Sequence, residues 1–244
     1  MTLKFVEKQK PFGPAPYTRP RDAATLILLR KTGDAPEVLM GRRAKTLVFM
    51  PNMFVFPGGR TERADLTAPR TGSLHPADAD RLVKGMGAKG SLRRAEALVM
   101  SAIRETHEET GLFIGRNGAA PSSKGPESWR AFTQAGVLPD LSAIRFIARA
   151  ITPPGRPRRF DTRFFVADAD HVCNPDELIA NPEEELEEVR WIGFNDFGGI
   201  KMPDITEAIL ELLADRLKDD PDLTADMPVP FIRAENRRFL YTFE

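Results

Sequence analysis

The chain has 244 residues, 41% of them apolar, and its 35 lysines and arginines balance its 35 aspartates and glutamates. This length is typical of one large or two small domains, and the apolar fraction can build a substantial core. The balanced charge excludes a general attraction to nucleic acid or membrane, and the single Cys173 excludes a disulfide framework and a cysteine metal cluster.

The N-terminal segment 1–21 is polar and proline-rich, without the apolar stretch of a signal peptide or a membrane span. We expect it to be an extension in front of a domain covering residues 22–218, with 219–244 as a tail that docks on that domain. The last four residues, Tyr241 to Glu244, are not a peroxisomal signal. A cytoplasmic location is therefore expected.

Hydrophobic periodicity and turn residues predict alternating strands and helices. In chain order, the predicted strands are Ala24–Arg30, Glu37–Arg43, Phe54–Phe56, Ser142–Ile151, Arg159–Ala167 and Glu188–Gly193. The predicted helices are Pro76–Lys84, Leu92–Thr110, Ser128–Gln134 and Asp204–Leu217. The tail after Pro221 is expected to be irregular. This mixed order indicates an α+β fold, in which helices cover both faces of a mixed sheet.

The end of the second predicted helix carries the strongest chemical signal. Arg104, Glu105, Glu108 and Glu109 fall within a turn and a half of helix, and Gly111 then stops it. Residues three and four apart share a helix face, so the three carboxylates crowd together. Crowded carboxylates repel one another unless a cation lies between them, and hard divalent ions prefer such oxygen ligands. A solvated, charge-laced helix is the alternative.

These residues resemble the Nudix box, which reads Gly, five residues, Glu, seven residues, Arg-Glu, an apolar residue, any residue, Glu-Glu, any residue, Gly, an apolar residue. The positions that fit are Gly90, Glu96, Arg104, Glu105, Glu108, Glu109, Gly111 and Leu112. Thr106 stands where an aliphatic residue is usual, and it is expected to lie on the packing face and bond a carbonyl one turn back. Upstream, Phe54 to Gly59 is similar to the strand and Pro-Gly-Gly turn that normally lead into the box. The resemblance implies a Nudix-type α/β/α sandwich.

Two glycines compete for the first position of the box. Arg104 lies 14 residues after Gly90 but 45 after Gly59, so a box that begins at Gly59 carries 31 inserted residues (45 − 14). We favour Gly59, because glycine in a tight turn lets a backbone carbonyl approach a cation. Residues 61–91 are then an insertion at the surface or over the site mouth, and Gly90→Ala is expected to be mild. An interrupted box of this kind resembles a Nudix subgroup that includes coenzyme A diphosphatases.

The resemblance implies a site with Mg²⁺ or Mn²⁺ as cofactor. Glu105, Glu108, Glu109 and the Gly59 carbonyl would hold the metal, and Arg104 would hold Glu105 in place. A downstream carboxylate can complete such sites, and Glu185 is our choice among Glu183, Glu184 and Glu185. Glu105 and Glu185 are both candidates for the general base. His107 is expected to be a surface histidine.

Candidate substrate-binding residues are Arg43, Arg158, Arg159, Phe160 and Arg163. Arginine offers a planar fork for phosphate oxygens, and Phe160 could stack on a base. An edge strand of alternating charge is the alternative for the cluster from 156 to 163. Arg43-Ala44 and Phe56 to Gly59 also match half of a coenzyme A pyrophosphatase signature, whereas Val48 and Asn52 depart from it.

The resemblance implies a hydrolase that cleaves the pyrophosphate of a nucleoside diphosphate derivative, with coenzyme A or acyl-CoA as the leading candidate. ADP-ribose, NADH and nucleotide sugars are alternatives within the same chemistry. A Nudix-like domain that senses a nucleotide without cleaving it is the alternative from another class. The expected partner is a small-molecule substrate, not nucleic acid or a membrane, and the sequence leaves a homodimer open.

Overall fold

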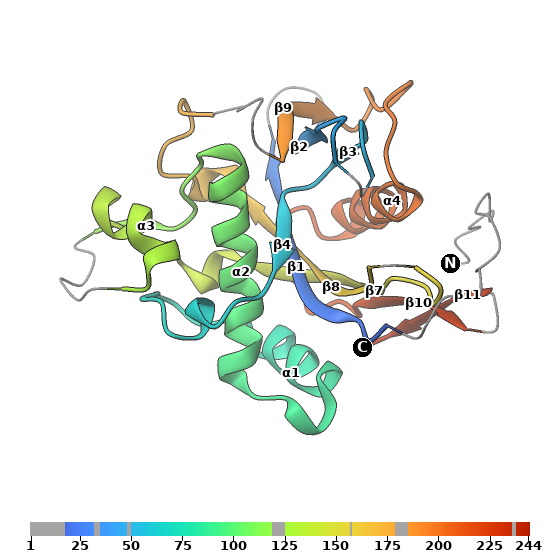
Figure 1. Cartoon of the computed structure of the whole chain (residues 1–244), viewed down its shortest axis with the longest axis horizontal. Coiled ribbons are helices and arrows are strands. Elements are labelled where there is room, and N and C mark those ends of the chain that lie inside the picture. Colours follow the sequence, from blue (N-terminus) through green and yellow to red (C-terminus); the bar gives the residue numbers. More distant parts are fainter. Residues whose placement is uncertain are drawn as a thin grey trace.

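A large mixed β-sheet runs through the molecule (Figure 1). The computed structural model describes residues 18–31, 35–47, 50–118, 125–156, 158–178, 185–235 and 238–244. Within these residues nine strands form one sheet, with the main order β11-β10-β7-β8-β1-β2-β3. The strands are β1 (Arg21–Arg30), β2 (Glu37–Arg43), β3 (Phe54–Val55), β4 (Gly58–Arg60), β7 (Arg145–Ile151), β8 (Phe160–Asp168), β9 (Leu186–Gly193), β10 (Pro230–Glu235) and β11 (Arg238–Phe243).

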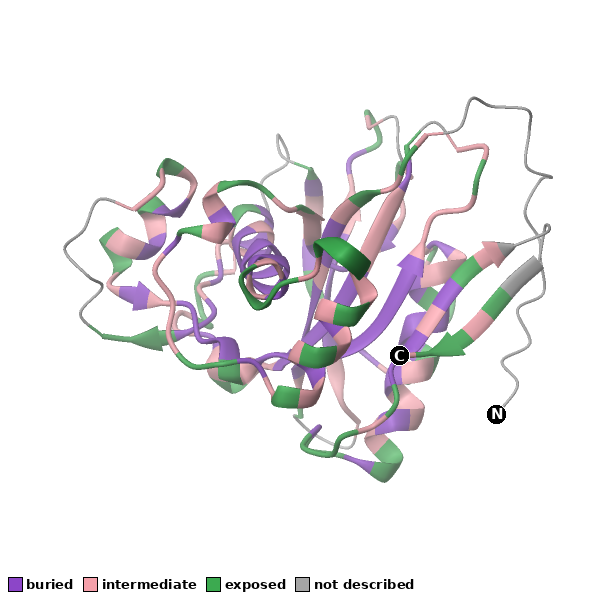
Figure 2. Ribbon diagram, turned by 90° about the horizontal axis from the view of Figure 1, so that it is seen from below, coloured by how far each residue is buried: buried purple, intermediate pink, exposed green. Residues whose placement is uncertain are grey.

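Helices cover both faces of this sheet. The helices are α1 (Pro76–Gly85), α2 (Leu92–Thr110), α3 (Arg130–Ala135) and α4 (Asp204–Asp219), and β5 (Arg116–Asn117) pairs with β6 (Val137–Leu138) outside the main sheet. One core cluster joins α2 to one sheet face, and a second joins α4 to the other. The expected α/β/α sandwich is therefore confirmed, and Figure 2 shows α2 end-on as a mostly buried coil.

The central strand β1 sets the position of the site. Its parallel neighbour is β8, and two antiparallel neighbours share its other edge. The short strand β4 pairs with its first half, where Ala24 lies opposite Gly59, and β2 pairs with its last residues. The Pro-Gly-Gly turn is thereby fixed against the middle of the sheet, beneath α2.

Helix α2 has the bounds that the sequence predicts, and the reasons are local. The Ser91 side chain caps its first turn by accepting from the Arg94 N–H, and Gly111 ends it with a φ of 75°. This left-handed conformation suits glycine at a helix C-terminus. Thr106 is fully buried on the packing face and donates to the Ala102 carbonyl at 2.8 Å, as expected.

The segment 61–91 contributes to the core, contrary to our expectation of a surface insertion. It contains the short 3₁₀ helices Ala64–Leu66 and Gly87–Lys89 as well as α1, but no strand of the sheet. Leu74 and Leu82 are buried in the cluster that also contains the apolar face of α2. The reason is the amphipathic character of α1, which packs its apolar side against α2.

The C-terminal tail is not irregular, which corrects a second expectation. Strand β10 pairs in parallel with β7, and β11 pairs with β10 as the edge of the sheet. Ile232 is almost fully buried in the core cluster on the α4 side. Phe231 and Ile232 lie opposite Arg149 and Ala150 of β7, so pairing with the edge of β7 places the apolar residues of β10 on the sheet.

Candidate active site

The three box glutamates lie on the last turns of α2 and differ in burial. The whole Glu109 residue is only 7% exposed, whereas the Glu105 and Glu108 side chains are 16% and 45% exposed. The helix is anchored by its opposite, apolar face, so the carboxylates are presented toward β4 from a rigid support.

The Pro-Gly-Gly turn meets these carboxylates directly. The Gly58 N–H donates to Glu109 Oε2 at 3.1 Å. A Cβ atom at Gly59 would lie 2.3 Å from Glu105 Oε2, so only glycine leaves room for this carboxylate. Strand β4 and helix α2 thus bring the Pro-Gly-Gly turn into contact with Glu105 and Glu109.

Gly90 lies at the other end of α2, just before its N-cap. A Cβ atom there would lie 2.1 Å from the Val83 carbonyl oxygen at the end of α1. The carboxylates begin 15 residues later, about 22 Å along a helix that rises 1.5 Å per residue. Gly90 is therefore a packing glycine, and the expectation that Gly90→Ala would be mild is wrong because a backbone atom occupies the space.

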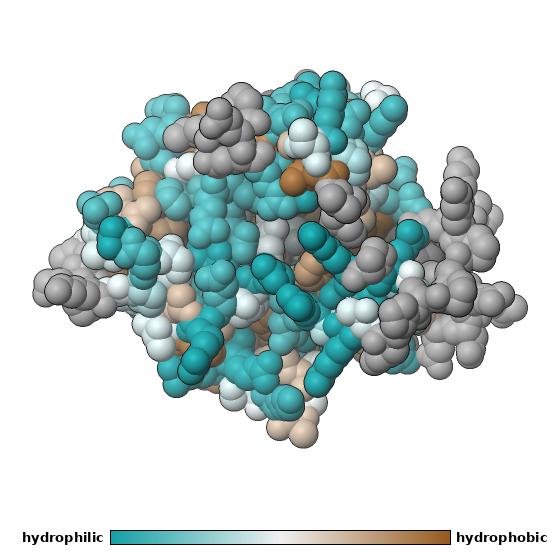
Figure 3. Space-filling model, in the orientation of Figure 1, coloured by the Kyte–Doolittle hydropathy of each residue, from teal (hydrophilic) through white to brown (hydrophobic). Residues whose placement is uncertain are grey.

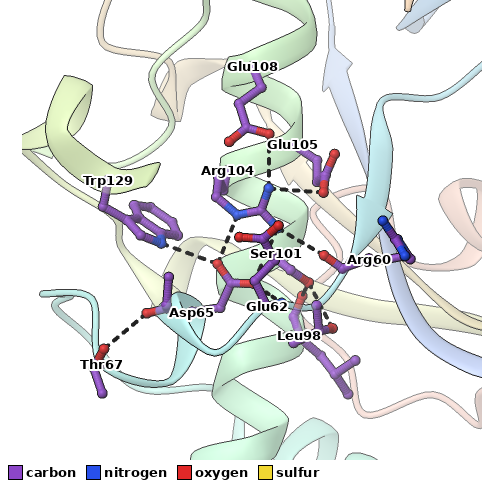
Figure 4. Close-up of polar contacts among 12 residues, drawn as sticks. Arg60, Glu62, Asp65, Thr67, Leu98, Ser101, Arg104, Glu105, Glu108 and Trp129 are labelled. Atoms are coloured by element: carbon purple, nitrogen blue, oxygen red, sulfur yellow. Dashed lines mark hydrogen bonds and ion pairs between the residues drawn. The ribbon is translucent and has the colours of Figure 1, made fainter. Parts of the chain in front are cut away.

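Arg104 is the centre of a buried ion-pair network (Figure 4). Its Nη1 donates to Glu105 Oε1 and to Glu108 Oε2, both at 2.9 Å, and its Nη2 donates to the Arg60 carbonyl. Its Nε donates to Asp65 Oδ1 at 2.9 Å. Burial opposes the charged guanidinium, but its hydrogen bond to Asp65 and the charges of the nearby carboxylates together raise the pKa of Arg104.

Asp65 is a site residue that our sequence reasoning missed. It is fully buried and also accepts a hydrogen bond from the Trp129 indole at 3.2 Å. Five residues separate it from Gly59, which is the spacing of the first acidic residue of the box. Glu96, which fits the box when it is counted from Gly90, pairs instead with Arg70. Counting from Gly59 would have found Asp65, with aspartate in place of glutamate.

The carboxylates are electrostatically unfavourable as they stand. Burial raises the pKa of Glu109 well above its ordinary value, and the charges of Glu185 and Glu105 raise it further. Burial also raises the pKa of Glu105 and of Glu108, although Arg104 opposes both shifts. A divalent cation would relieve this crowding, and an all-oxygen set suits Mg²⁺ or Mn²⁺. The residues therefore fit a metal site.

The carboxylates do not form a finished cage. Across the described part of the chain, no three His, Cys, Asp or Glu side chains surround one point as metal ligands. Arg104 explains this at the box, because its Nη1 bonds both Glu105 and Glu108 and draws them toward itself. A cation at this site would compete with Arg104 for the oxygens of Glu105 and Glu108.

Comparison with known proteins agrees with this geometry. A NUDIX hydrolase crystal structure from Alicyclobacillus acidocaldarius is 32% identical and matches with a TM-score of 0.62, covering 81% of this chain and 92% of that one. The chain belongs to the Nudix hydrolases. No family model matches it.

Two curated Nudix relatives are more distant in sequence. Nudix hydrolase 7 of Caenorhabditis elegans is 27% identical over 184 residues, covering 70% of this chain and 51% of that protein. The acyl-coenzyme A diphosphatase NUDT19 of Gallus gallus is 29% identical over 183 residues, covering 53% of this chain and 47% of that protein. The chain thus spans about half the length of these relatives. None of its described helices combines the length and the apolar character of a membrane span.

Arg43 and Glu185 lie beside the Nudix carboxylates. Arg43 ends β2, and its Nη2 is 2.7 Å from Glu185 Oε1. Both side chains are close enough to Glu109 to shift its pKa. The charge of Glu185 raises this pKa, and the charge of Arg43 lowers it. Glu185 is exposed, so it can change partners. Glu183 and Glu184, like Val48 of the half signature, lie outside the described residues.

The predicted arginine cluster at β8 is mostly structural. Arg159 is buried and donates to the Thr152 and Thr18 carbonyls. Arg163 is only 1% exposed and pairs with Asp22 and Asp161. These two side chains hold strands together, which corrects the expectation that they bind phosphate. Arg158 is exposed and Phe160 is half-buried at the start of β8, so both remain accessible.

Two further side chains are explained by packing. His107 is not a free surface histidine, because it is half-buried and stacks on Phe113 with ring centroids 4.1 Å apart. Burial accordingly lowers its pKa. Cys173 is half-buried, and burial raises the pKa of its thiol, so it is not an activated nucleophile.

Proposed function

We propose that this protein is a metal-dependent hydrolase that cleaves the diphosphate of a nucleoside diphosphate derivative. The observation that carries the proposal is the meeting of the Pro-Gly-Gly turn with the box carboxylates. The Gly58 N–H bonds Glu109, and Gly59 leaves no gap for a side chain beside Glu105. The sensing alternative without hydrolysis is less favoured, because the complete carboxylate set is present.

Glu105, Glu108, Glu109 and the Gly59 carbonyl would hold Mg²⁺ or Mn²⁺. A bound divalent ion neutralises diphosphate oxygens and lowers the pKa of a water molecule. Glu105 and Glu185 are the candidates to accept the water's proton, and the raised pKa of Glu105 brings it closer to that task. Arg104 positions Glu105 through their 2.9 Å hydrogen bond.

Coenzyme A or acyl-CoA is the substrate we favour. The interrupted box, the half signature at Arg43 and Phe56 to Gly59, and the similarity to a protein named acyl-coenzyme A diphosphatase support it. ADP-ribose, NADH and nucleotide sugars share the bond to be cleaved. We further propose that the protein acts in the cytoplasm on a small-molecule substrate. Direct measurement of its mass in solution would distinguish a monomer from a homodimer.

A substrate panel tests this function. The purified protein would be incubated with Mg²⁺ or Mn²⁺ and each of coenzyme A, acyl-CoA, ADP-ribose, NADH and a nucleotide sugar, with products separated by chromatography. We expect coenzyme A or its thioesters to be cleaved at the diphosphate, and Glu109→Gln to abolish cleavage. Hydrolysis in excess chelator would contradict the proposal. Tight binding of a nucleotide from the panel without hydrolysis of any panel member would also contradict it.

A further inference from the structure

A cationic hollow adjoins the carboxylate site, and we call it the arginine pocket. It lies between the start of β1, the segment that follows β4, and the first half of α2. Arg21, Arg60 and Arg63 lie along it, and Leu66, Met86 and Leu98 provide apolar walls. Hydrophilic residues dominate the face over α2 and β4 in Figure 3.

The three arginines differ from the other arginines near the site. All three are exposed, and no side-chain partner for them occurs among the described residues. Arg94 in the same hollow pairs with Asp22, and Arg104 is buried in its network. In Figure 4 the Arg60 side chain turns away from Arg104, and only its carbonyl oxygen joins that network. The pocket thus holds positive charge that the fold itself does not use.

The arginine pocket lies next to the box carboxylates along β4 and α2. Arg60 directly follows Gly59 in β4. Glu62, which also lines the hollow, is close enough for its charge to raise the pKa of Glu108. Leu98 precedes Glu105 by seven residues, which is about 10 Å at 1.5 Å per residue of helix. A nucleotide held at the carboxylates by its diphosphate can therefore extend into this hollow.

We propose that the arginine pocket binds a phosphomonoester on the substrate, separate from the diphosphate that is cleaved. This inference rests on the proposed function and narrows it to nucleotides that carry a ribose phosphate, such as the 3′-phosphate of coenzyme A. A phosphomonoester carries a charge of roughly −1.5 to −2 near neutral pH. Guanidinium groups bind its oxygens through paired hydrogen bonds, while the apolar walls can contact sugar and base.

Binding of fragments tests the proposal without any hydrolysis. Adenosine 3′,5′-bisphosphate, its 2′,5′ isomer and AMP contain no diphosphate bond, so calorimetry on the wild-type protein measures affinity alone. We expect at least one bisphosphate to bind ten-fold or more tightly than AMP. Arg63→Gln and Arg60→Gln should each remove most of this preference and leave AMP binding unchanged. Equal affinities for all three ligands, or variants that keep the preference, would overturn the proposal.

A matched control and a kinetic arm separate this inference from the proposed function. Arg130→Gln removes one exposed arginine from α3, away from the pocket, and should keep the preference. With metal, the ratio of kcat/KM for coenzyme A to that for dephospho-coenzyme A should fall ten-fold or more in Arg63→Gln. If neither compound is hydrolysed, the proposed function fails, whereas the calorimetric comparison still decides the pocket.

Discussion

Asp65 and Arg104 are 39 positions apart in the sequence, yet they form a fully buried ion pair with Nε 2.9 Å from Oδ1. This contact joins the two halves of the interrupted box. It places the guanidinium that holds Glu105 and Glu108, so the geometry of the proposed catalytic carboxylates depends on a residue outside α2.

Replacing Asp65 should therefore be far more damaging than replacing Glu96. Asp65→Asn leaves the Arg104 charge buried with less compensation, and breaking such a pair costs about 3–5 kcal/mol of stability. The pair of Glu96 with Arg70 lies nearer the surface, with side chains 20% and 19% exposed, and should contribute about 0–1 kcal/mol, so Glu96→Gln serves as the control. Urea unfolding of the two variants measures the difference. Similar losses of unfolding free energy for both variants would contradict the assignment of Gly59 as the first glycine of the box.

Changing Gly59 and Gly90 to alanine should affect different properties of the protein. At Gly59 the new methyl group meets the Glu105 carboxyl, a flexible side-chain end, so we expect activity and metal affinity to fall with little loss of stability. At Gly90 it meets the Val83 carbonyl, which is backbone, so the melting temperature should fall while metal affinity is kept. Thermal unfolding with and without Mn²⁺ distinguishes the two. Loss of metal affinity in Gly90→Ala alone would reverse our assignment.

Glu109→Gln should lower turnover by several orders of magnitude without destabilising the metal-free protein. The substitution removes a buried charge whose ionisation is already disfavoured, and it keeps the size of the side chain. Wild type should gain melting temperature on addition of Mg²⁺ or Mn²⁺, because a ligand that binds only the native state stabilises it. The variant should lose most of that gain. Wild-type turnover in the variant would rule out the proposed metal role of Glu109.

The pH dependence of stability should change sign on metal binding. In the metal-free protein the pKa of Glu109 is raised above its ordinary value of 4.5, so the native state holds this proton more tightly than the unfolded state. Stability should therefore fall as pH rises from about 4.5 through the raised pKa. In saturating metal the deprotonated form is favoured, and stability should rise over the same window. Urea unfolding in chelator and in Mn²⁺ measures both slopes, and Glu109→Gln should flatten the chelator curve.

Local signals in the sequence predict α2 well. Ser91 before it, Gly111 after it and the apolar stripe between them define Leu92–Thr110 without help from the rest of the fold. The meeting of Gly59 with Glu105 is also predictable, because the box resemblance specifies both positions. These features depend on residues that are close in sequence or on a fixed motif.

What the sequence does not predict depends on distant partners. Arg159 and Arg163 have the character of phosphate-binding residues until Thr18 and Asp22, on the neighbouring β1 side, are seen to engage them. The strands β10 and β11 lack a strong alternating pattern and are stabilised by the open edge of β7. The core role of segment 61–91 likewise depends on α1 packing against α2, which no local pattern specifies.

The ion pair between Asp65 and Arg104 can also be kept when the chain that connects the two residues changes in length. Loop-closure entropy rises by about 0.6 kcal/mol per doubling, so lengthening a seven-residue connection to the present one costs about 1.5 kcal/mol. Burial of one large apolar side chain such as Leu82 offsets roughly that amount. A domain inserted near the exposed Ser73 should therefore leave the box carboxylates in place, provided that the core contacts of α1 are kept.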